Sequence, residues 1–258
     1  MTNVDDLAKK IQLLDEAYRA GNPLVSDYEF DKLRAELVDI APDHPTLLSP
    51  GGGNYLLSLG NHSFEDWYRD LPHNTDVIVE PKIDGCAVAL RYRFGELVKA
   101  WNRKGKDITY AMRKVKNLPQ KINHLDCLEV RGELYGLTGH TKSQRLAAGL
   151  MRKKVPTGEG LAFCAFEIMG KDDGYEVDTL QQLLCWGFHV CGHIHIKSNV
   201  IQKVKVLHED WKDSLVFSRY PTDGLVVKVN NHKLQAELGS GSVAPRWALA
   251  VKEWKDPD

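Results

Sequence analysis

The sequence predicts an α+β protein, in which a small helical segment precedes a larger body built mainly from antiparallel strands. Residues 4–18 carry apolar side chains at helical spacing, whereas residues 77–101 show short alternating runs separated by a turn. Farther along, strands and helices mix without a regular β–α–β rhythm, which favours antiparallel sheets. With 258 residues, 43% of them hydrophobic, the chain can bury a full core and is too apolar for a disordered protein.

Two predicted helices form a helical head over residues 1–50. The apolar stripe of the first helix consists of Val4, Leu7, Ala8, Ile11, Leu14 and Tyr18. Ser26, with Glu29 three residues later, is a capping box that begins a second helix after the break at Gly21-Asn22-Pro23. A proline- and glycine-rich stretch between residues 42 and 53 is typical of a linker, so we predict a boundary at residue 50 and a body over residues 51–258.

The body is expected to contain short strands and one clear helix. Alternation over residues 86–92, a turn at Phe94-Gly95 and a run over residues 97–101 predict a hairpin. The helix is expected over residues 179–186, after Asp178 and before Gly187. The other expected strands are residues 77–80, 128–131, 161–168, 225–229 and 247–251.

Composition excludes several classes of protein. No stretch approaches the run of roughly 20 apolar residues that a membrane span needs, and residues 1–10 lack the apolar core of a secretory signal. The five cysteines include no CxxC pair, which argues against a disulfide framework and against a zinc ribbon. We therefore expect a cytoplasmic protein with reduced cysteines and no membrane partner.

The net charge of −1 hides an asymmetry between head and body. Residues 1–76 hold 14 acidic and 6 basic side chains, whereas residues 77–258 hold 21 acidic and 28 basic ones. The densest basic stretch, residues 91–116, contains nine lysines and arginines. Such stretches bind phosphates or nucleic acid, although many are only solvated faces, so the asymmetry alone indicates two modules and no particular ligand.

The sharpest local feature is Glu80-Pro81-Lys82-Ile83-Asp84-Gly85, directly after a predicted buried strand. On its own, this segment is explained just as well without any catalytic role, by a strand that ends at Pro81 and a turn at Asp84-Gly85. Three further motifs follow it in order along the chain. They are Leu128-Glu129-Val130-Arg131-Gly132-Glu133, Asp223-Gly224-Leu225-Val226-Val227-Lys228 and Ala244-Pro245-Arg246-Trp247-Ala248-Leu249-Ala250-Val251-Lys252.

Together these motifs resemble the series of the nucleotidyltransferase superfamily of DNA ligases, RNA ligases and capping enzymes, and most closely the adenylation domain of bacterial NAD-dependent DNA ligases. Ser58-Leu59-Gly60-Asn61 and Trp186-Gly187-Phe188 also fit that family, and the resemblance covers residues 14–254. It implies an ATP-grasp-like nucleotidyltransferase body. It also implies a ligase of DNA replication and repair, in which Lys82 attacks the α-phosphate of NAD and releases nicotinamide mononucleotide. The resulting lysyl-AMP is passed to the 5′-phosphate of a nick.

The chemistry of lysine agrees with this resemblance. A lysine amine is a nucleophile only when deprotonated, and neighbouring cations favour the neutral form. We expect Lys228 and Lys252 to point into the pocket of Lys82, where they would favour its neutral form and neutralise charge on the α-phosphate. Because side chains alternate along a strand, Lys252 shares a face with the small residues Ala248 and Ala250, which leaves room for a ligand.

The resemblance implies roles for further residues. Glu80 is expected to bind the adenine amino group, and Phe166 to stack on the base where the family usually has tyrosine. Glu133 is expected to hold the ribose hydroxyls and Arg103 the phosphates. The other implied cofactor-binding residues of the body are Ser58, Leu59, Asp84, Lys228 and Lys252. Asp223, with Glu133, is expected to position Mg²⁺ through water, and Arg131 and Arg152 to contact DNA phosphates.

The head favours NAD over ATP. The mononucleotide leaving group of NAD carries a cationic nicotinamide ring, which suits aromatic and acidic side chains. The segment that contains Tyr18, Asp27, Phe30 and Asp31 resembles the nicotinamide-binding module that ATP-dependent ligases lack. It departs from that module at Phe30, where tyrosine is usual, and at Tyr18 or Arg19, where histidine is usual.

Two alternatives stay open at the level of sequence: a polynucleotide ligase that uses ATP or acts on RNA, and a module that binds nucleotide or nucleic acid without turnover. Full ligases of the family continue into an oligonucleotide-binding barrel, a four-cysteine zinc module, helix-hairpin-helix repeats and a BRCT domain, none of which is recognised in these 258 residues. We therefore expect nicked double-stranded DNA as a partner. The missing modules are expected either from a longer chain or from a second polypeptide, and we expect self-adenylation with poor nick sealing by this chain alone.

Overall fold

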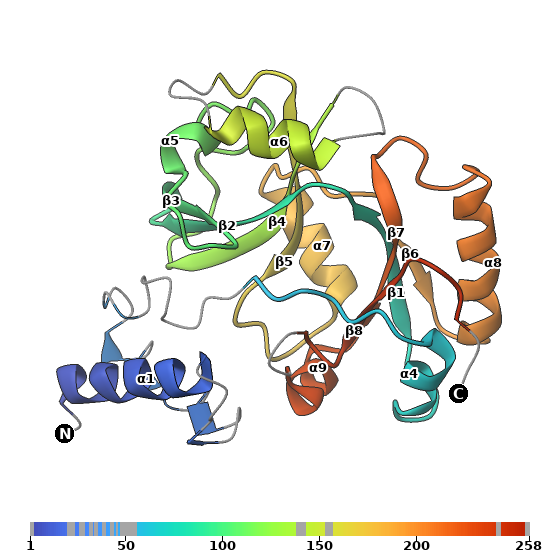
Figure 1. The fold of residues 1–258 in the computed structure, drawn as a ribbon, viewed down its shortest axis with the longest axis horizontal. Helices are drawn as coiled ribbons and strands as arrows, with labels where there is room; N and C mark the ends of the chain where they lie inside the picture. The colour runs from blue at the N-terminus through green and yellow to red at the C-terminus, as the bar shows by residue number, and fades with distance from the viewer. Residues whose placement is uncertain are drawn as a thin grey trace.

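The computed structural model describes residues 3–19, 24–25, 29–30, 33, 36–37, 40–41, 44, 46, 56–137, 143–152, 157–240 and 244–255. Its body contains two four-stranded sheets, and every pairing of neighbouring strands within them is antiparallel (Figure 1). The predicted α+β class with antiparallel sheets is therefore confirmed. No helix within these described ranges is long and apolar enough to cross a membrane.

The first sheet has the strand order β6-β1-β7-β8, and the second has the order β3-β2-β4-β5. The strands of the first sheet are β1 (Val77–Ile83), β6 (Ile194–Ile196), β7 (Thr222–Val229) and β8 (Ala248–Val251). The strands of the second are β2 (Cys86–Arg93), β3 (Glu96–Asn102), β4 (Leu128–Gly136) and β5 (Leu161–Ile168). Since only Asp84 and Gly85 separate β1 from β2, the two sheets meet beside the Lys82 motif.

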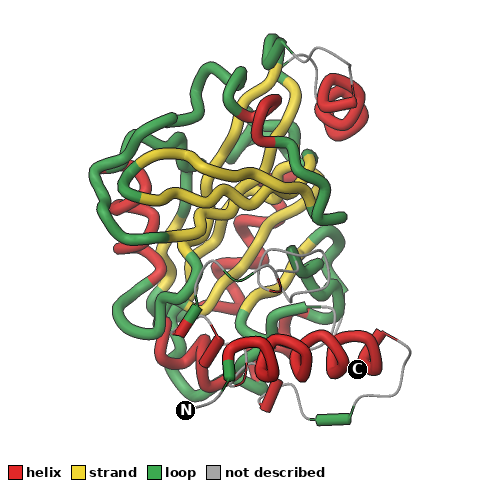
Figure 2. The backbone as a smooth tube through the Cα atoms, turned by 90° about the vertical axis from the view of Figure 1, so that its left-hand side faces the viewer, coloured by secondary structure: helices red, strands yellow, loops and turns green. Residues whose placement is uncertain are grey.

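Seven described helices accompany these strands. They are α1 (Val4–Arg19), α4 (Phe64–Arg69), α5 (Thr109–Met112), α6 (Ser143–Arg152), α7 (Glu176–Cys185), α8 (Val200–Lys212) and α9 (His232–Leu238). In the body, α7 packs against β5, α6 against β4, and both α8 and α9 against β7. Figure 2 shows the strands of both sheets in yellow with these helices, in red, around and against them.

Side-chain alternation divides each strand of the first sheet between a core and an open face. Val77 and Val79 of β1 belong to a hydrophobic cluster with Leu249 and Val251 of β8 and with residues of α4 and α8. The opposite face of β1 carries Glu80 and Lys82, because successive side chains on a strand point to opposite sides. This open face carries the chemistry of the site.

Two motif glycines let neighbouring strands approach closely. A Cβ on Gly85 would overlap the carbonyl oxygen of Leu134 on β4, and a Cβ on Gly132 would overlap the carbonyl oxygen of Cys164 on β5. Only a residue without a side chain fits such positions. The glycines of the Lys82 and Glu133 motifs thus keep β2, β4 and β5 in register behind the site.

Several expected element boundaries were wrong: β4 continues to Gly136 and β7 begins at Thr222, and two further differences have a clear cause. Pro81 does not end the first strand: β1 continues to Ile83, with a register shift against β7 between Pro81 and Ile83. Pro81 is tolerated there because β6 pairs only as far as Val79, so the ladder on that side has already ended. Helix α7 begins at Glu176, three residues earlier than expected, because Asn230 accepts the backbone N–H groups of Glu176 and Val177.

Helices α4, α5, α6, α8 and α9 and the short strand β6 were not expected from the sequence.

The expected reduced state of the cysteines also differs from the structure. The sulfur atoms of Cys164 on β5 and Cys191 are paired as a disulfide, with Cα atoms 6.3 Å apart. A backbone hydrogen bond from Ala165 N to His189 O, 2.9 Å long, brings the two segments together. Sequence spacing did not reveal this pairing, because the two cysteines are 27 residues apart.

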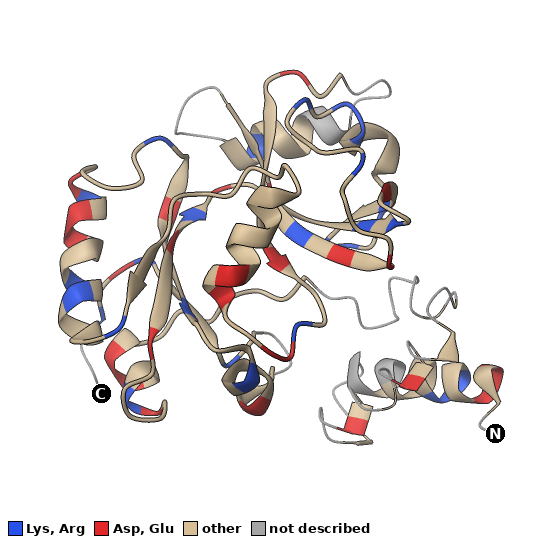
Figure 3. Ribbon diagram, turned by 180° about the vertical axis from the view of Figure 1, so that it is seen from behind, with Lys and Arg blue, Asp and Glu red and all other residues tan. Residues whose placement is uncertain are grey.

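The head has its own small apolar cluster. Leu7, Ala8 and Ile11 of α1 are buried with Leu37, which confirms the stripe predicted on the first helix. Glu29, Phe30, Leu33, Glu36, Leu37 and Ile40 are helical, as expected for the second helix, whereas Ser26 of the predicted capping box lies outside the described residues. Figure 3 shows acidic and basic residues interspersed over both sheets of the body.

Candidate active site

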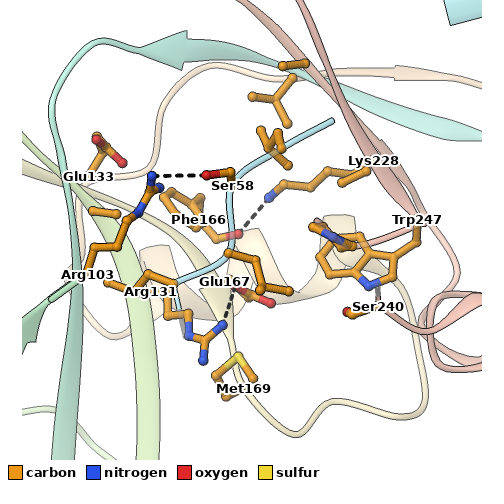
Figure 4. A pocket seen from close by; sticks show the side chains of 18 of the residues that line it. Ser58, Arg103, Arg131, Glu133, Phe166, Glu167, Met169, Lys228, Ser240 and Trp247 are labelled. Carbon is orange, nitrogen blue, oxygen red and sulfur yellow. Dashed lines mark hydrogen bonds and ion pairs between the residues drawn. The ribbon is translucent and has the colours of Figure 1, made fainter. Parts of the chain in front are cut away.

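A cavity of about 1340 Å³ is lined by residues of both sheets and of the head. The body contributes the ends of β1, β4, β5, β7 and β8, and the head contributes Leu14, Leu24, Val25 and Phe30. The cavity contains every body residue predicted to bind the cofactor. These are Ser58, Leu59, Glu80, Lys82, Asp84, Arg103, Glu133, Phe166, Lys228 and Lys252, together with Asp223. Figure 4 shows part of this lining.

Lys82 and Lys252 share one carboxylate. Nζ of Lys82 donates to Oδ1 of Asp223 at 2.8 Å, and Nζ of Lys252 lies 2.7 Å from Oδ2 of the same residue. Burial raises the pKa of Asp223, but its hydrogen bonds to Lys252 and Lys82 outweigh burial and hold that pKa below its usual value. The nearest charged partner of Lys82 is therefore a carboxylate, where the sequence led us to expect cations.

Lys228 is the centre of a separate, buried cluster. Its Nζ lies 2.6 Å from Oε2 of Glu80 and 2.8 Å from Oε1 of Glu176, and it donates to the carbonyl oxygen of Phe166 at 2.8 Å. Burial alone would lower the pKa of Lys228, but Glu176 and Glu80 reverse that effect and raise it. Lys228 is thus firmly charged, and its carboxylate partners differ from the one that Lys82 holds.

Glu176 and His232 were missed at the sequence level. Both line the cavity, and Nε2 of His232 lies 3.2 Å from Oε2 of Glu176. Each stands in the first turn of a helix, where a polar residue usually faces solvent, so the local pattern gave no signal. Both are 3% exposed, because α7 packs onto β5 and α9 packs onto β7.

Glu133 is a carboxyl group of the cavity with a strongly shifted pKa. Burial raises its pKa to about 8, and the neighbouring Lys82 and Arg103 only partly oppose that shift. At neutral pH its carboxyl group is therefore largely protonated. A protonated carboxyl group both donates and accepts hydrogen bonds, which suits a partner with hydroxyl groups.

Arg103 and Phe166 both lie beside the Ser58 segment in Figure 4. Nη1 of Arg103 donates to Oγ of Ser58 at 3.3 Å. The ammonium group of Lys228 lies 5.3 Å from the centre of the Phe166 ring, within the range of a cation–π contact. The cavity thus offers an aromatic face, a guanidinium group and hydrogen-bonding groups to a single ligand.

A comparison with models of known protein families shows to which family the chain belongs. The model of the NAD-dependent DNA ligase adenylation domain matches residues 57–141 and 136–255. The chain belongs to this family.

Individual relatives agree with this assignment. A DNA ligase of Clostridioides difficile (strain 630) is 30% identical over 98% of this chain and 46% of its own length. A DNA ligase of Natranaerobius thermophilus is 29% identical over 96% of this chain and 46% of its own length. The chain therefore spans less than half the length of these curated relatives. Among solved structures, the ATP-dependent DNA ligase of bacteriophage T7 in complex with ATP has 15% identity and a TM-score of 0.45, over 67% of this chain and 63% of that one.

The two arginines predicted to contact DNA are Arg131, which is buried, and Arg152, which ends helix α6. Arg131 is 8% exposed, and its Nε donates to Oε1 of Glu129 at 2.9 Å. Its Nη1 also lies 3.9 Å from Oε2 of Glu167, as Figure 4 shows. A DNA phosphate would have to displace these carboxylates. Arg152 is the last residue of α6, and its side chain lies outside what the structure describes.

The predicted residues of the head are only partly described. Phe30 lines the cavity, and its role in binding nicotinamide stays a prediction. Asp27 and Asp31 lie outside the described residues, and Tyr18 is described only as a residue of α1. The apolar side chains of Leu14, Leu24 and Val25 also reach the cavity, a contribution that the sequence did not indicate.

The proposed Mg²⁺ ligands do not form a ready-made inner-sphere site. Both carboxylate oxygens of Asp223 are occupied by Lys82 and Lys252, and the raised pKa of Glu133 favours its protonated form. Direct coordination of Mg²⁺ requires deprotonated oxygen ligands, so Asp223 and Glu133 do not hold the ion directly in this arrangement. Their water-mediated role toward Mg²⁺ stays a prediction. Cys164, His189 and Cys191 also converge, but the pairing of the two cysteines leaves only one imidazole for a metal ion.

Proposed function

We propose that this chain carries out the adenylation half-reaction of NAD-dependent DNA ligation. After Lys82 has lost a proton to solvent, its neutral Nζ atom attacks the α-phosphorus of NAD and the bond between that phosphorus and the nicotinamide mononucleotide oxygen breaks. Nicotinamide mononucleotide leaves, the nitrogen releases a second proton to solvent, and a lysyl-AMP forms. The observation that carries the proposal is the position of Lys82. It lies in a large cavity with Lys252 across a shared carboxylate, inside a domain of the NAD-dependent ligase family.

The charge arrangement supports an anionic substrate at this point. Lys252 is 41% exposed and lies on the cavity face beside Ala248 and Ala250, so a phosphate can reach it. An α-phosphate that replaces Asp223 as the partner of Lys252 comes to lie beside Lys82. Because one anion takes the place of another beside Lys252, the local charge stays balanced, and the free-energy cost of the exchange is low.

The other expected roles belong to the same proposal. Glu80 binds the adenine amino group, Phe166 stacks on the base, Glu133 holds the ribose hydroxyls, and Arg103 with Ser58 faces the phosphates. The head, through Phe30, Leu14, Leu24 and Val25, covers the nicotinamide end. Nicked double-stranded DNA as the acceptor of the adenylyl group, Mg²⁺ as an accompanying ion and the cytoplasm as the location stay part of the proposal.

Intact-mass measurement tests the proposal directly. We expect incubation with NAD and Mg²⁺ to add one adenylyl group to the wild-type chain, and peptide mapping to place it on Lys82. The Lys82→Arg variant, which keeps the charge, should gain no adduct. An adduct formed with ATP but not with NAD would show that the head has been misinterpreted, and an adduct retained in Lys82→Arg would contradict the mechanism.

A further inference from the structure

The ammonium group of Lys228 uses all three of its hydrogens within the protein. Its partners are Glu80 at 2.6 Å, Glu176 at 2.8 Å and the Phe166 carbonyl oxygen at 2.8 Å. An ammonium group has three donors and no acceptor. Lys228 can therefore contact a substrate oxygen only after one of these three partners has moved away.

The two carboxylates around Lys228 are held very differently. Nε2 of His232 lies 3.2 Å from Oε2 of Glu176, and Nε2 of Gln235 donates to the same oxygen at 3.4 Å. These two side chains are themselves fixed: Nδ1 of His232 lies 2.8 Å from the carbonyl oxygen of Asp173, and Gln235 donates to the Val229 carbonyl oxygen at 2.7 Å. Among the described residues, Lys228 is the polar partner found for the carboxylate of Glu80. Glu80 is consequently the partner that is easiest to release.

Glu80 and Glu176 also differ in how firmly each carboxyl group keeps its negative charge. Burial raises the pKa of Glu80, and the nearby charge of Glu176 adds to that effect despite the presence of Lys228. Burial acts in the same direction on Glu176, but Lys228 and His232 outweigh it and lower the pKa of Glu176. Glu176 therefore keeps its negative charge more firmly than Glu80 does.

We propose that Glu176 is the permanent counter-ion of Lys228 and is fixed in place by His232 and Gln235. Glu80 can then leave Lys228 and bind the amino group of adenine. The inference rests on the proposed function, in which Glu80 binds the base. When Glu80 turns to the base, Lys228 keeps Glu176 and the Phe166 carbonyl oxygen, and its third hydrogen becomes available to the substrate. Without Glu176, the same movement would leave a buried ammonium group without a counter-ion, which is strongly unfavourable. Glu176 is thus a positioning residue that acts through Lys228 and Glu80.

A comparison of two dinucleotides tests this role. Nicotinamide hypoxanthine dinucleotide differs from NAD by an oxygen in place of the adenine amino group, so it lacks the group that Glu80 binds. We expect the wild type to form its covalent adduct faster with NAD than with this analogue. In Glu176→Gln, Glu80 is retained by Lys228, so the preference for NAD should fall about tenfold, the value of one lost hydrogen bond to a charged group. The fall should come mainly from a higher half-saturating concentration of NAD, with the maximal rate changed less than about threefold.

Matched variants separate positioning from a merely structural role. Glu237→Gln makes the same chemical change at an exposed position of α9 and should leave the preference unchanged. Glu176→Asp keeps the charge and should retain more of the preference than Glu176→Gln does. His232→Leu removes one hydrogen bond to Glu176 without removing its charge, and should lower the preference about threefold. Thermal melting checks that each variant is folded, and His232→Leu carries the test if Glu176→Gln does not fold.

Each outcome bears on one proposal or on both. An unchanged preference for NAD in folded Glu176→Gln and His232→Leu, even with lowered melting temperatures, overturns the positioning role and leaves adenylation intact. A wild type that forms adducts with both dinucleotides at equal rates overturns the role of Glu80 and with it this inference. A wild type that forms no adduct with either dinucleotide overturns the proposed function itself.

Discussion

Two lysine–carboxylate clusters line the same cavity and differ in their exposure to solvent. In the outer cluster, the side chains of Lys82, Lys252 and Asp223 are 23%, 41% and 35% exposed. In the inner cluster, the side chains of Lys228, Glu80 and Glu176 are 6%, 6% and 4% exposed. Partners in the outer cluster can be exchanged for a substrate at little cost, because water screens the charges that are left. The inner cluster must stay paired, since an unpaired buried charge is strongly unfavourable.

The inner cluster should show the largest effect on stability. Lys228→Met leaves Glu80 and Glu176 without their counter-ion, so we expect the free energy of unfolding to fall by about 3–5 kcal/mol. Denaturant titration of the variant and the wild type measures this difference. A loss below about 1 kcal/mol would mean that the two carboxylates are stable without Lys228, and the contrast between the clusters would not hold.

Glu133 provides a test that depends on pH. Because burial raises its pKa to about 8, the folded state keeps a proton that the unfolded state releases from about pH 4.5 upward. The stability contributed by this proton is present at low pH and is lost as the pH rises through the folded-state value. Glu133→Gln removes this dependence, so relative to the wild type its free energy of unfolding should be unchanged near pH 4 and higher by about 4 kcal/mol at pH 8.

Denaturant titrations at several pH values check this prediction. The adduct should form much more slowly in Glu133→Gln, because the ribose contact is altered while the fold is strengthened. A stability difference that does not change with pH would show that the carboxyl group of Glu133 is ionised in the folded protein at neutral pH.

The outer cluster should show the smallest effect on stability. Lys252→Met removes one half-exposed partner of Asp223, so we expect a change in the free energy of unfolding of less than about 1 kcal/mol. Adduct formation with NAD should nevertheless slow about a hundredfold, since a cation aimed at the reacting phosphate is lost. A normal rate of adduct formation would remove Lys252 from the site.

The motif residues and their strands were predictable from the sequence. Alternation placed Lys252 on the same face as Ala248 and Ala250, and the structure confirms that all three line the cavity. The apolar stripe of the first helix was equally clear, because a period of 3.6 residues is a local property. The start of α7 was not predictable, since the groups that accept its first N–H bonds belong to Asn230, more than 50 residues away.

The sequence by itself determined the family, the antiparallel α+β class and the motif side chains that meet in the cavity, but not Glu176 or His232. These follow from strand periodicity and from motifs whose members are close together in the chain. Only the tertiary structure decided which carboxylate each lysine holds: Asp223 for Lys82 and Lys252, and Glu80 with Glu176 for Lys228. The physical reason is that an ion pair depends on distance and burial. Lys228 and Glu176 are 52 residues apart, so no local pattern fixes either quantity.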